Sequence, residues 1–508
     1  MSSPSTPEKS GPPMHAEDIH RPRKTAQEDK IPVHEKALYG LGSPAMGMIN
    51  QVIEYQVQQV LVYGLGMSPV LKGIIIMIFR IWDAFTDPVM GWISDNTRTR
   101  FGRRRPYMFF GTIAMCALLP FVWRFDESWD IIRIAIWFTG FGMIMSTATT
   151  VFNIPYQTLK MEMTPDYNER TSINVYAGMV IQLFAFFNPW VWKLTQTPLF
   201  TGQLPGEEPN TLLGIRNMAI LFAVVALLLG MVPTFVCKER YYAKASKQKR
   251  EPLLRSLKLT FRSRPFLMML AIIFTMNLEG LVSGMGGYLA LYHVFGGDKV
   301  FAATFAGISG TVGAILGMAS IPFFGMLAKR FGKDRSLLTV TGAHIIMAAS
   351  ILFCYNPDFP WLVMIRGVMN GVLMTGLWTV VPAMKADIVD DDEARTGERR
   401  EGSFESIFSW FLRFTGTVFA GISGFIVVAL GFNIETGTEQ GEGVFLRMIL
   451  MMSCIPMALG ALQFYIIWRW PLTAGVMEEI RDKLESSRGK IDMSGGGLVA
   501  EAEGASSK

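Results

Sequence analysis

Residues 77–106 read MIFRIWDAFTDPVMGWISDNTRTRFGRRRP, and this stretch decides the fold. Its apolar part could cross a bilayer, carries Asp83 and Asp87 one helical turn apart, and runs into a polar segment with five arginines. Carboxylates four residues apart lie on the same face of a helix. At membrane depth such groups are costly unless they are paired, protonated or bound to a cation. The stretch therefore predicts a cation-binding site on a membrane helix whose basic end stays on the cytoplasmic side.

A purely architectural salt bridge is the alternative interpretation of these two acids. Arg80 lies one turn before them and could be their partner or part of the same polar network. Because ionisable residues inside a membrane are functional by default, the cation site is favoured, with sodium as the metal ion if the coupling ion is a metal.

The composition is that of a membrane protein with many spans. Half of the 508 residues are hydrophobic, 18% are charged, and the mean hydropathy is +0.31. Apolar stretches of about 20 residues, enough to cross a bilayer as a helix, recur along the chain. They are long and do not alternate, which favours helices over barrel strands. We therefore expect an all-α membrane protein with twelve transmembrane helices, at residues 40–65, 69–94, 106–124, 131–157, 171–194, 213–237, 265–293, 300–328, 336–355, 360–384, 403–432 and 444–469.

The segments between these spans alternate in their content of lysine and arginine. Basic residues occur in 95–105, 158–170, 238–264, 329–335 and 385–400. The connections near 66–68, 196–212, 356–359 and 433–443 hold none. By the positive-inside rule both termini are expected in the cytoplasm. The net charge of +5 is then explained by topology, and we expect no nucleic-acid partner.

This topology divides the chain into two six-helix bundles with tails. The bundles are expected at residues 37–237 and 265–470, joined by a basic cytoplasmic linker at 238–264. Residues 1–36 are polar and lack the apolar core of a signal peptide, so we expect a disordered cytoplasmic tail. Residues 471–508 are expected to form a second cytoplasmic tail.

Similar motifs stand at equivalent places in the two halves. Gly91 and the basic run 100–105 recur as Gly325 and the run 329–335. A second pair of motifs follows spans four and ten, which favours duplication, as in transporters whose binding site lies between two repeats. Asp and Arg near the ends of these helices can form salt bridges to neighbouring helices and so close the cytoplasmic side. The alternative is that these charges only set the orientation of the helices in the membrane. The residues that we assign to this gate are Asp95, Arg103, Asp166, Arg170, Asp387 and Arg400.

Polar residues also occur within the spans. Gln51, Glu54 and Gln58 follow Gly47 at spacings of 4, 3 and 4, a helical period that places a polar stripe in an apolar span. Such a stripe faces a water-filled cavity or another helix. In the other spans the polar or aromatic positions of interest are Thr149, Thr150, Asn153, Glu279, Trp378 and Arg413. Taken with Glu54, Asp83 and Asp87, these positions put an acid cluster in the first half opposite the cation Arg413 in the second. The role of Glu279 stays open.

Motifs for enzyme chemistry do not occur in the sequence. We find no phosphate loop, nucleophile elbow or zinc motif, and the four cysteines lack metal or disulfide spacing. We therefore expect no enzyme activity and no cofactor besides a coupling ion.

The quoted residues resemble the glycoside–pentoside–hexuronide:cation symporters, the melibiose-permease group of the major facilitator superfamily. The resemblance covers nearly all of 37–470 and is most specific in RIWDAFTDPVMG at 80–91 together with 95–106, with further matches at 153–156, 166–171, 386–390 and 400–402. It implies two six-helix bundles, alternating access, and a coupling ion near Asp83, Asp87, Thr150 and Asn153. Trp378 falls on an aromatic position that resembles part of the family's sugar site.

Several positions depart from melibiose permease. That protein carries Asp where this chain has Gly47 and Asn153, Trp at Gln157, and Arg near Gly178. A galactoside like melibiose is therefore not expected, and sodium and proton both stay open as the coupling ion. The family's lysine in span eleven is replaced by Arg413, which keeps the charge.

We expect a cation-coupled symporter of a sugar, glycoside or uronic acid. The residues that we expect to bind this solute are Gln51, Glu54, Gln58, Gln157, Trp378 and Arg413. A lysolipid transporter of the same wider group is the alternative, and a receptor that no longer transports is a third interpretation. The bilayer is the expected surroundings, most simply a bacterial inner membrane, and the protein is expected to be a monomer.

Overall fold

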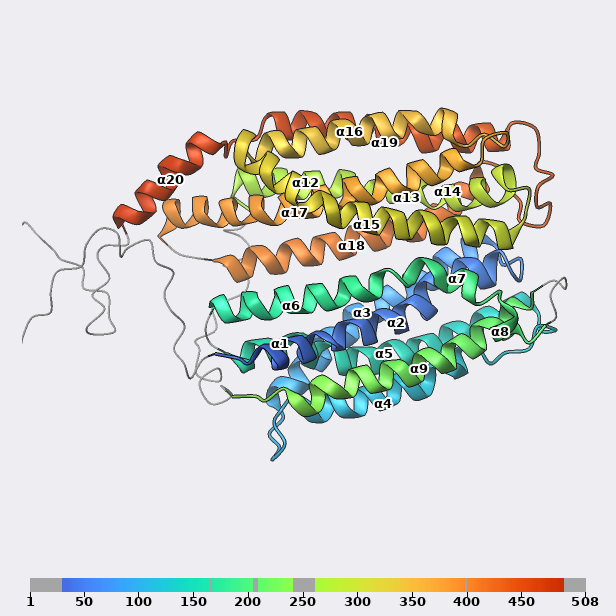
Figure 1. The fold of residues 1–508 in the computed structure, drawn as a ribbon, viewed down its shortest axis with the longest axis horizontal. Coiled ribbons are helices and arrows are strands. Elements are labelled where there is room, and N and C mark those ends of the chain that lie inside the picture. The colour runs from blue at the N-terminus through green and yellow to red at the C-terminus, as the bar shows by residue number, and fades with distance from the viewer. Residues whose placement is uncertain (1–29, 165–166, 204–208, 241–260, 398–399, 488–508) are drawn as a thin grey trace, which may run out of the picture.

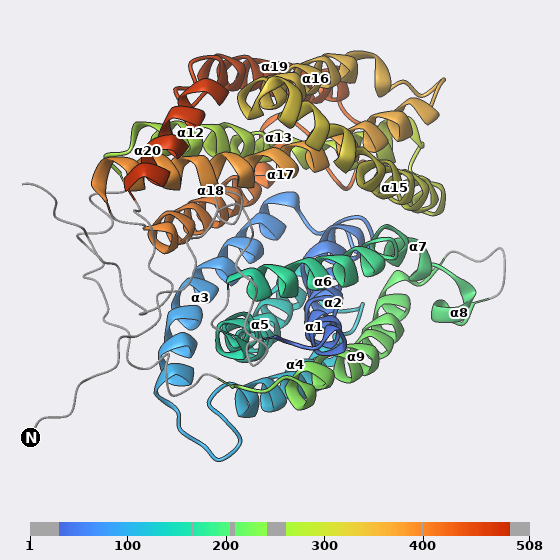
Figure 2. The ribbon, with the colours of Figure 1, turned by 60° about the vertical axis from the view of Figure 1, so that its left-hand side comes forward.

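The computed structural model describes residues 30–164, 167–203, 209–240, 261–397 and 400–487, and in these ranges the regular structure is entirely helical (Figure 1). The helices form two groups that lie side by side with their long axes roughly parallel, one built from the first half of the chain and the other from the second (Figures 1 and 2). The predicted linker at 238–264 falls largely on 241–260, outside the described residues.

The first group consists of α1 (Val33–Gly40), α2 (Gly42–Asn50), the π-helices η3 (Gln51–Tyr55) and η4 (Val57–Val62), α3 (Pro69–Asn96), α4 (Arg105–Val122), α5 (Ile131–Met163), α6 (Tyr167–Ala185), the 3₁₀ turn η5 (Asn188–Trp190), α7 (Val191–Leu194), α8 (Pro198–Thr201) and α9 (Thr211–Val236). Within this group α5 packs on both α3 and α4, and α9 packs on α2 and α4.

The second group consists of α12 (Arg264–Leu278), α13 (Gly280–Ser283), α14 (Met285–Tyr288), the π-helix η6 (Leu289–Val294), α15 (Lys299–Phe331), α16 (Lys333–Cys354), α17 (Trp361–Thr396), α18 (Glu401–Ala429), α19 (Val444–Trp468) and α20 (Ala474–Ser487). Here α15 and α16 pack on α17, and α12 packs on α18 and α19.

Ten helical segments in the described part of the chain are long and apolar enough to cross a membrane. The other two predicted spans are 40–65, which corresponds to α1, α2, η3 and η4, and 69–94, which corresponds to α3. The first changes from α to π winding at Gln51, and the second carries Lys72, Arg80, Asp83 and Asp87 within its length. The count of twelve therefore stays a prediction.

Side-chain caps explain where several of the long helices begin. Asp130 accepts a hydrogen bond from the backbone N–H of Ile132 at the start of α5, with a distance of 3.1 Å. Asp298 does the same for Phe301 at the start of α15, at 2.9 Å. Such caps satisfy backbone donors that have no partner inside the helix. Each cap therefore sets the point at which a span leaves its loop.

The tails differ from the expectation near the bundle. A disordered tail is expected over 1–36, but α1 begins at Val33, and Lys36 forms an ion pair of 2.8 Å with Glu169. The ion pair anchors this part of the segment on α6, which local polarity does not reveal. At the other end, residues 474–487 of the predicted tail form α20, which packs against α17 (Figure 2).

The two halves are in close contact at the end of the bundle where α3 begins and α18 ends. A Cβ atom at Gly73 would overlap the carbonyl oxygen of Gly421, and one at Gly424 would overlap that of Pro69. On the other side of the bundle, Trp190 Nε1 donates to Thr311 Oγ1 at 2.7 Å. We call these contacts the seam. Small residues let the helix backbones approach closely, as is common in membrane bundles.

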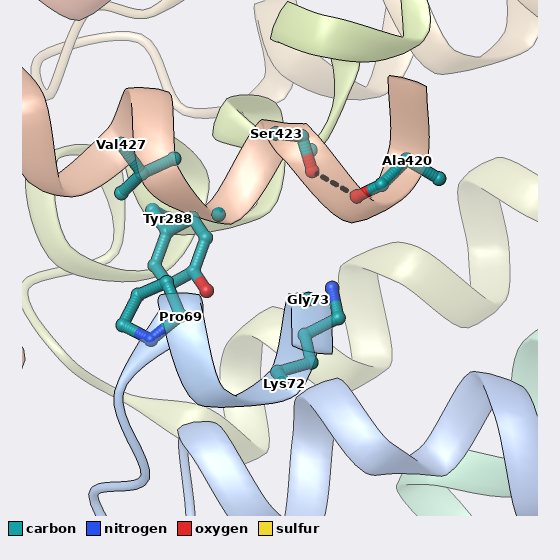
Figure 3. A pocket seen from close by; sticks show the side chains of 9 residues that line it. Pro69, Lys72, Gly73, Tyr288, Ala420, Ser423 and Val427 are labelled. Atoms are coloured by element: carbon teal, nitrogen blue, oxygen red, sulfur yellow. Dashed lines mark hydrogen bonds between the residues drawn. The ribbon is translucent and has the colours of Figure 1, made fainter. Parts of the chain in front are cut away.

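The seam leaves almost no space between the halves. A void of only about 10 Å³, the size of one water molecule, lies among Lys72, Tyr288, Ser423 and their neighbours (Figure 3). Tyr63 extends the contact, with its ring centroid 5.4 Å from that of Tyr288 in an edge-to-face arrangement. At this end the two halves are therefore closely packed against each other.

Candidate functional site

Asp83 and Asp87 occupy consecutive turns of α3, and each faces a hydroxyl group of α5. Ser146 Oγ donates a short hydrogen bond to Asp83 Oδ1, and Thr150 Oγ1 donates to Asp87 Oδ1 at 2.9 Å. Ser146 and Thr150 are themselves one turn apart, so the two helices meet in register. The result is two carboxylate–hydroxyl pairs in succession, which we call the oxygen ladder. All four side chains are only partly exposed or buried.

Arg80 joins the oxygen ladder to the first span. Its guanidinium forms an ion pair of 2.6 Å with Glu54 and lies 3.6 Å from Asp83 Oδ2. The cluster therefore holds three carboxylates against one cation within the first half. Burying uncompensated negative charge in a membrane is unfavourable, so this arrangement favours uptake of a further cation.

The ligand chemistry of the oxygen ladder suits a hard monovalent cation or a proton. Carboxylate and hydroxyl oxygens are the ligands that hard cations prefer. Among the described residues, no group of three or more His, Cys, Asp and Glu side chains is arranged to hold a metal ion. The ladder is therefore built from two acids and two hydroxyls and differs from a transition-metal site.

The other first-half residues predicted for this region lie on the same helix, α5. Asn153 is partly buried, three residues after Thr150, and Gln157 is exposed one turn later. Thr149 donates its hydroxyl to the carbonyl oxygen of Ser146 at 2.7 Å, so it satisfies the helix backbone. Trp82, next to Asp83, donates its indole N–H to Thr147 at 2.9 Å, which adds a second link between α3 and α5.

The three polar residues of the predicted stripe, Gln51, Glu54 and Gln58, each have a partner. Gln51 Nε2 donates to the carbonyl oxygen of Asn188 at 3.2 Å, and Gln58 Oε1 accepts a short hydrogen bond from Lys72. A cavity of about 460 Å³ lies beside Gln51 and is lined by Gly47, Asn50, Tyr55, Asn188 and Pro189 as well. The stripe therefore points in three directions, toward this cavity, toward Arg80 and toward the seam. The π-helical winding after Gln51 explains why a regular helical period does not hold there.

From the second half, Arg413 reaches the neighbourhood of the ladder. It lies on α18, the helix that packs on α3, and its charge acts electrostatically on Asp83. Trp378 lies on α17 with 40% of its surface exposed. The helix that carries the acids of the first half thus packs on the helix that carries Arg413.

The predicted gating residues form ion pairs inside each half. Arg103 pairs with Glu162 of α5, with Nε 2.7 Å from Oε1, and Arg104 binds both Asp95 and Glu162. In the second half, Lys333 Nζ lies 2.6 Å from Asp387 Oδ1. Arg400 forms a salt bridge with Asp392, with Nη2 2.5 Å from Oδ1. Asp166 lies outside the described residues, and the side chain of Arg170 is not described.

Reasoning from the sequence missed several polar residues of these networks, including Glu162 and Asp392 in the ion pairs above. Ser146 and Lys72 are described above, and His344 of α16 lies 2.8 Å from Glu279. A hydroxyl four residues before Thr150 could have been noticed from spacing alone. The partners of Lys72 and Glu279 depend on which helices pack together, and no local pattern predicts that.

Comparison with known proteins agrees with this arrangement. The family model described as MFS/sugar transport protein matches residues 38–474. The chain is 24% identical to sodium-dependent lysophosphatidylcholine symporter 1-A of Danio rerio, over 89% of this chain and 88% of that protein. It is 24% identical to the glucuronide carrier protein homolog of Escherichia coli K12, over 83% and 89%. The isoprimeverose transporter of Lactiplantibacillus pentosus is also 24% identical, over 81% and 83%.

Solved structures of the same fold include a D-xylose–proton symporter, with a TM-score of 0.58 and 13% identity, covering 86% of this chain and 97% of that one. A bacterial homologue of the iron transporter ferroportin in an inward-facing state gives a TM-score of 0.57 and 14% identity, over 87% and 99%. These similarities show the major facilitator fold. The match over residues 38–474, together with ten helices able to span a membrane, identifies the chain as a multi-pass membrane protein of the glycoside–pentoside–hexuronide:cation symporter family within the major facilitator superfamily.

Proposed function

We propose that this protein couples the entry of a cation, sodium or a proton, to the uptake of a sugar, glycoside or uronic acid by alternating access. The observation that carries the proposal is the oxygen ladder of Asp83, Ser146, Asp87 and Thr150. It lies on the helix that packs against α18 of the other half, so occupation by a cation would alter the charge between the halves. A cation that binds one arrangement of the halves more tightly than the other shifts their equilibrium.

The contacts between the halves support an inward-facing conformation. The closely packed seam lies at the end opposite the basic loops. Each ion pair described at the basic end joins two residues of the same half, so none of them links the two halves. With the basic loops in the cytoplasm by the positive-inside rule, the seam is the outer barrier. Twelve spans and cytoplasmic termini belong to the same proposal, and the bacterial relatives support a bacterial inner membrane.

A sugar site between the halves would use the exposed side chains described above. Trp378 can stack on the C–H face of a sugar ring, and the exposed Gln157 presents an amide group for hydroxyls. Gln51 is buried and already donates to Asn188, so it would border the site beside the cavity. Arg413 can bind a uronate carboxylate. A few polar contacts in a mainly apolar cavity are typical of small-molecule sites.

A second candidate solute is a lysolipid. The two helices that form the seam carry exposed aromatic side chains farther along, including Phe85 and Trp92 on α3, and Trp410 stacked on Phe414 on α18. Such a surface could accommodate an acyl chain between the halves. The Danio rerio protein named as a lysophosphatidylcholine symporter is similar to this chain over 89% of the chain's length.

Thermal unfolding of the purified protein distinguishes these candidates. We expect a stabilisation by one class among sugars, uronates and lysolipids, and a larger shift when sodium or a lower pH accompanies it, because binding to the folded state raises the melting temperature. Trp378→Ala should weaken sugar binding by about twofold to tenfold and Trp378→Phe by less, because aromatic stacking contributes about 0.5 to 1.5 kcal/mol. Trp361→Phe, on the same helix, is the control. Stabilisation by lysolipids alone would replace the sugar proposal with the lipid one.

A further inference from the structure

Glu279 and His344 form a buried pair in the second half, apart from the oxygen ladder. His344 Nε2 lies 2.8 Å from Glu279 Oε2, and each side chain is only 14% exposed. Glu279 lies at a break in its span, between the end of α12 at Leu278 and the start of α13 at Gly280. Interrupted membrane helices commonly surround ion sites in transporters.

The chemistry of the pair is that of a proton site. With the proton bound, His344 is an imidazolium whose Nε2–H donates to the Glu279 carboxylate, and the pair is neutral. Release removes the proton from Nδ1 and leaves a neutral imidazole that still donates from Nε2, so the pair carries one negative charge. Histidine is suited to this exchange because it titrates near neutral pH.

The elements packed against this pair hold other charges, and several of these are paired elsewhere. α12 and α13 contact α17, α18 and α19, while α16 contacts α15, α17 and α19. On α17, Arg366 binds Tyr355 at 3.3 Å and Lys385 binds Glu405 of α18 at 2.6 Å. Three further acids on α17 are also paired: Asp387 with Lys333, Asp391 with Arg395 and Asp392 with Arg400. The other titratable or charged side chains described on these elements are Arg264 of α12, Lys299, Lys329 and Arg330 of α15, Asp334, Arg335 and Cys354 of α16, Asp390 and Glu393 of α17, Arg413 of α18, and Arg447, Cys454 and Tyr465 of α19.

Arg413 connects this region to the cation site. Two residues before Glu279, Asn277 Nδ2 donates to the carbonyl oxygen of Leu412 at 3.0 Å and to Thr415 Oγ1 at 2.7 Å. These two residues flank Arg413 on α18, and the charge of Arg413 acts on Asp83. The break in the span is thereby hydrogen-bonded to α18, the helix that packs on α3.

We propose that Glu279 and His344 bind a proton at a second ion site, whose occupancy is linked through Asn277 and α18 to the cation site of the first half. The site goes beyond the proposed symport, because it adds an ion-binding position in the half opposite the oxygen ladder. Proton binding itself is measurable in protein that is not transporting, so a failure of the transport proposal would leave this one testable.

Nuclear magnetic resonance of the imidazole groups tests the proposal in full-length protein in nanodiscs. The chain has five histidines, and replacing His15, His20, His34 and His293 by Gln leaves His344 as the single imidazole without changing the pair. In spectra recorded from about pH 5 to pH 8, we expect its signal to move as the proton is bound and released. Glu279→Gln in this background should change that pH profile, because it removes the carboxylate that balances the imidazolium. Glu405→Gln, an acid on α18 that is exposed, is the matched control and should leave the profile unchanged.

A His344 signal that stays constant over this pH range overturns the proposal, and this result needs no change to the pair itself. A pH profile that Glu279→Gln leaves unchanged also overturns it. Linkage to the first half is tested by sodium binding at a fixed pH. Asn277→Ala should change the sodium affinity by at least about fivefold, the lower range of energetic coupling between sites, and an unchanged affinity overturns the linkage.

Discussion

At the scale of single residues, the oxygen ladder depends on equal spacing in two helices. Asp83 and Asp87 are four residues apart, as are Ser146 and Thr150, and each pair is separated by 63 positions along the chain. Both helices therefore present one group per turn to the same neighbour. When the O–H bond of Ser146 or Thr150 rotates away from its carboxylate, the hydroxyl oxygen can offer a lone pair to a cation. We therefore expect cation binding to depend more on the two carboxylates than on the two hydroxyls.

Substitutions in the ladder should weaken sodium binding to different degrees. Asp83→Asn and Asp87→Asn should each lower the affinity by at least about tenfold and abolish gradient-driven uptake, because an interaction with a charged group contributes about 1.5 to 3 kcal/mol. Ser146→Ala and Thr150→Val should have smaller effects, about fivefold, since a neutral hydrogen bond contributes about 1 kcal/mol. The sodium-dependent shift in melting temperature measures both.

Thr147→Val is a suitable control, because this neighbouring hydroxyl binds the Trp82 indole and lies outside the ladder. An aspartate variant that concentrates substrate at the wild-type rate would show that the acid has a structural role only.

At the scale of elements, the seam depends on glycine. α3 and α18 approach so closely that a Cβ atom at Gly424 would overlap the carbonyl oxygen of Pro69. Hydrogen bonds cannot easily replace such contacts in a membrane, where van der Waals packing between helices is a main attractive force. We therefore expect the closed end to be sensitive to a single methyl group.

Gly424→Ala should shift the protein away from the conformation in which the seam is closed. An overpacked contact costs about 1 to 3 kcal/mol, which changes the ratio of two conformations by about fivefold to 150-fold. Labelling of a cysteine placed at Ser423, which lines the small void in the seam, measures the change as a faster reaction with a water-soluble reagent.

Gly325→Ala is the matched control, because a Cβ atom at this glycine of α15 would have open space around it. Equal labelling rates in the Gly424→Ala and Gly325→Ala proteins would show that the seam tolerates the methyl group.

At the scale of the whole molecule, the two halves bring different charges to their interface. The first half contributes Glu54, Asp83 and Asp87 with Arg80, and the second contributes Arg413. A bound cation would offset the excess of acids on one side and change the attraction between the halves. The coupling ion is therefore expected to control their relative motion.

The identity of that ion can be measured in proteoliposomes with the solute found by thermal unfolding. If sodium is the coupling ion, uptake should fall to the level of protein-free vesicles in sodium-free buffer, even with an imposed inward proton gradient. Uptake that persists there and moves protons inward identifies the proton instead. Asp83→Asn protein, which is expected to lack the site, supplies the baseline in both buffers.

The sequence alone predicted the elements whose signals are local. Long apolar stretches indicated membrane helices, because backbone groups in a bilayer must bond within their own segment. The spacing of Asp83 and Asp87 predicted a shared helix face, and the Thr150 hydroxyl lies beside them. The motifs at 80–91 predicted the family that the match over 38–474 confirms. The twelve spans and the assignment of gating residues stay predictions.

Only the tertiary structure decided which distant side chains meet. Three contacts follow from the way whole helices pack: Ser146 with Asp83, Lys72 with Gln58, and His344 with Glu279. The alignment of one helix along another is set by many small contacts, which no local pattern contains. The π-helical turns after Gln51 also redirect a stripe that looks regular in sequence, because one extra residue per turn rotates every later side chain. The closed seam has the same origin, since the glycines that permit it are meaningful only once α3 and α18 face each other.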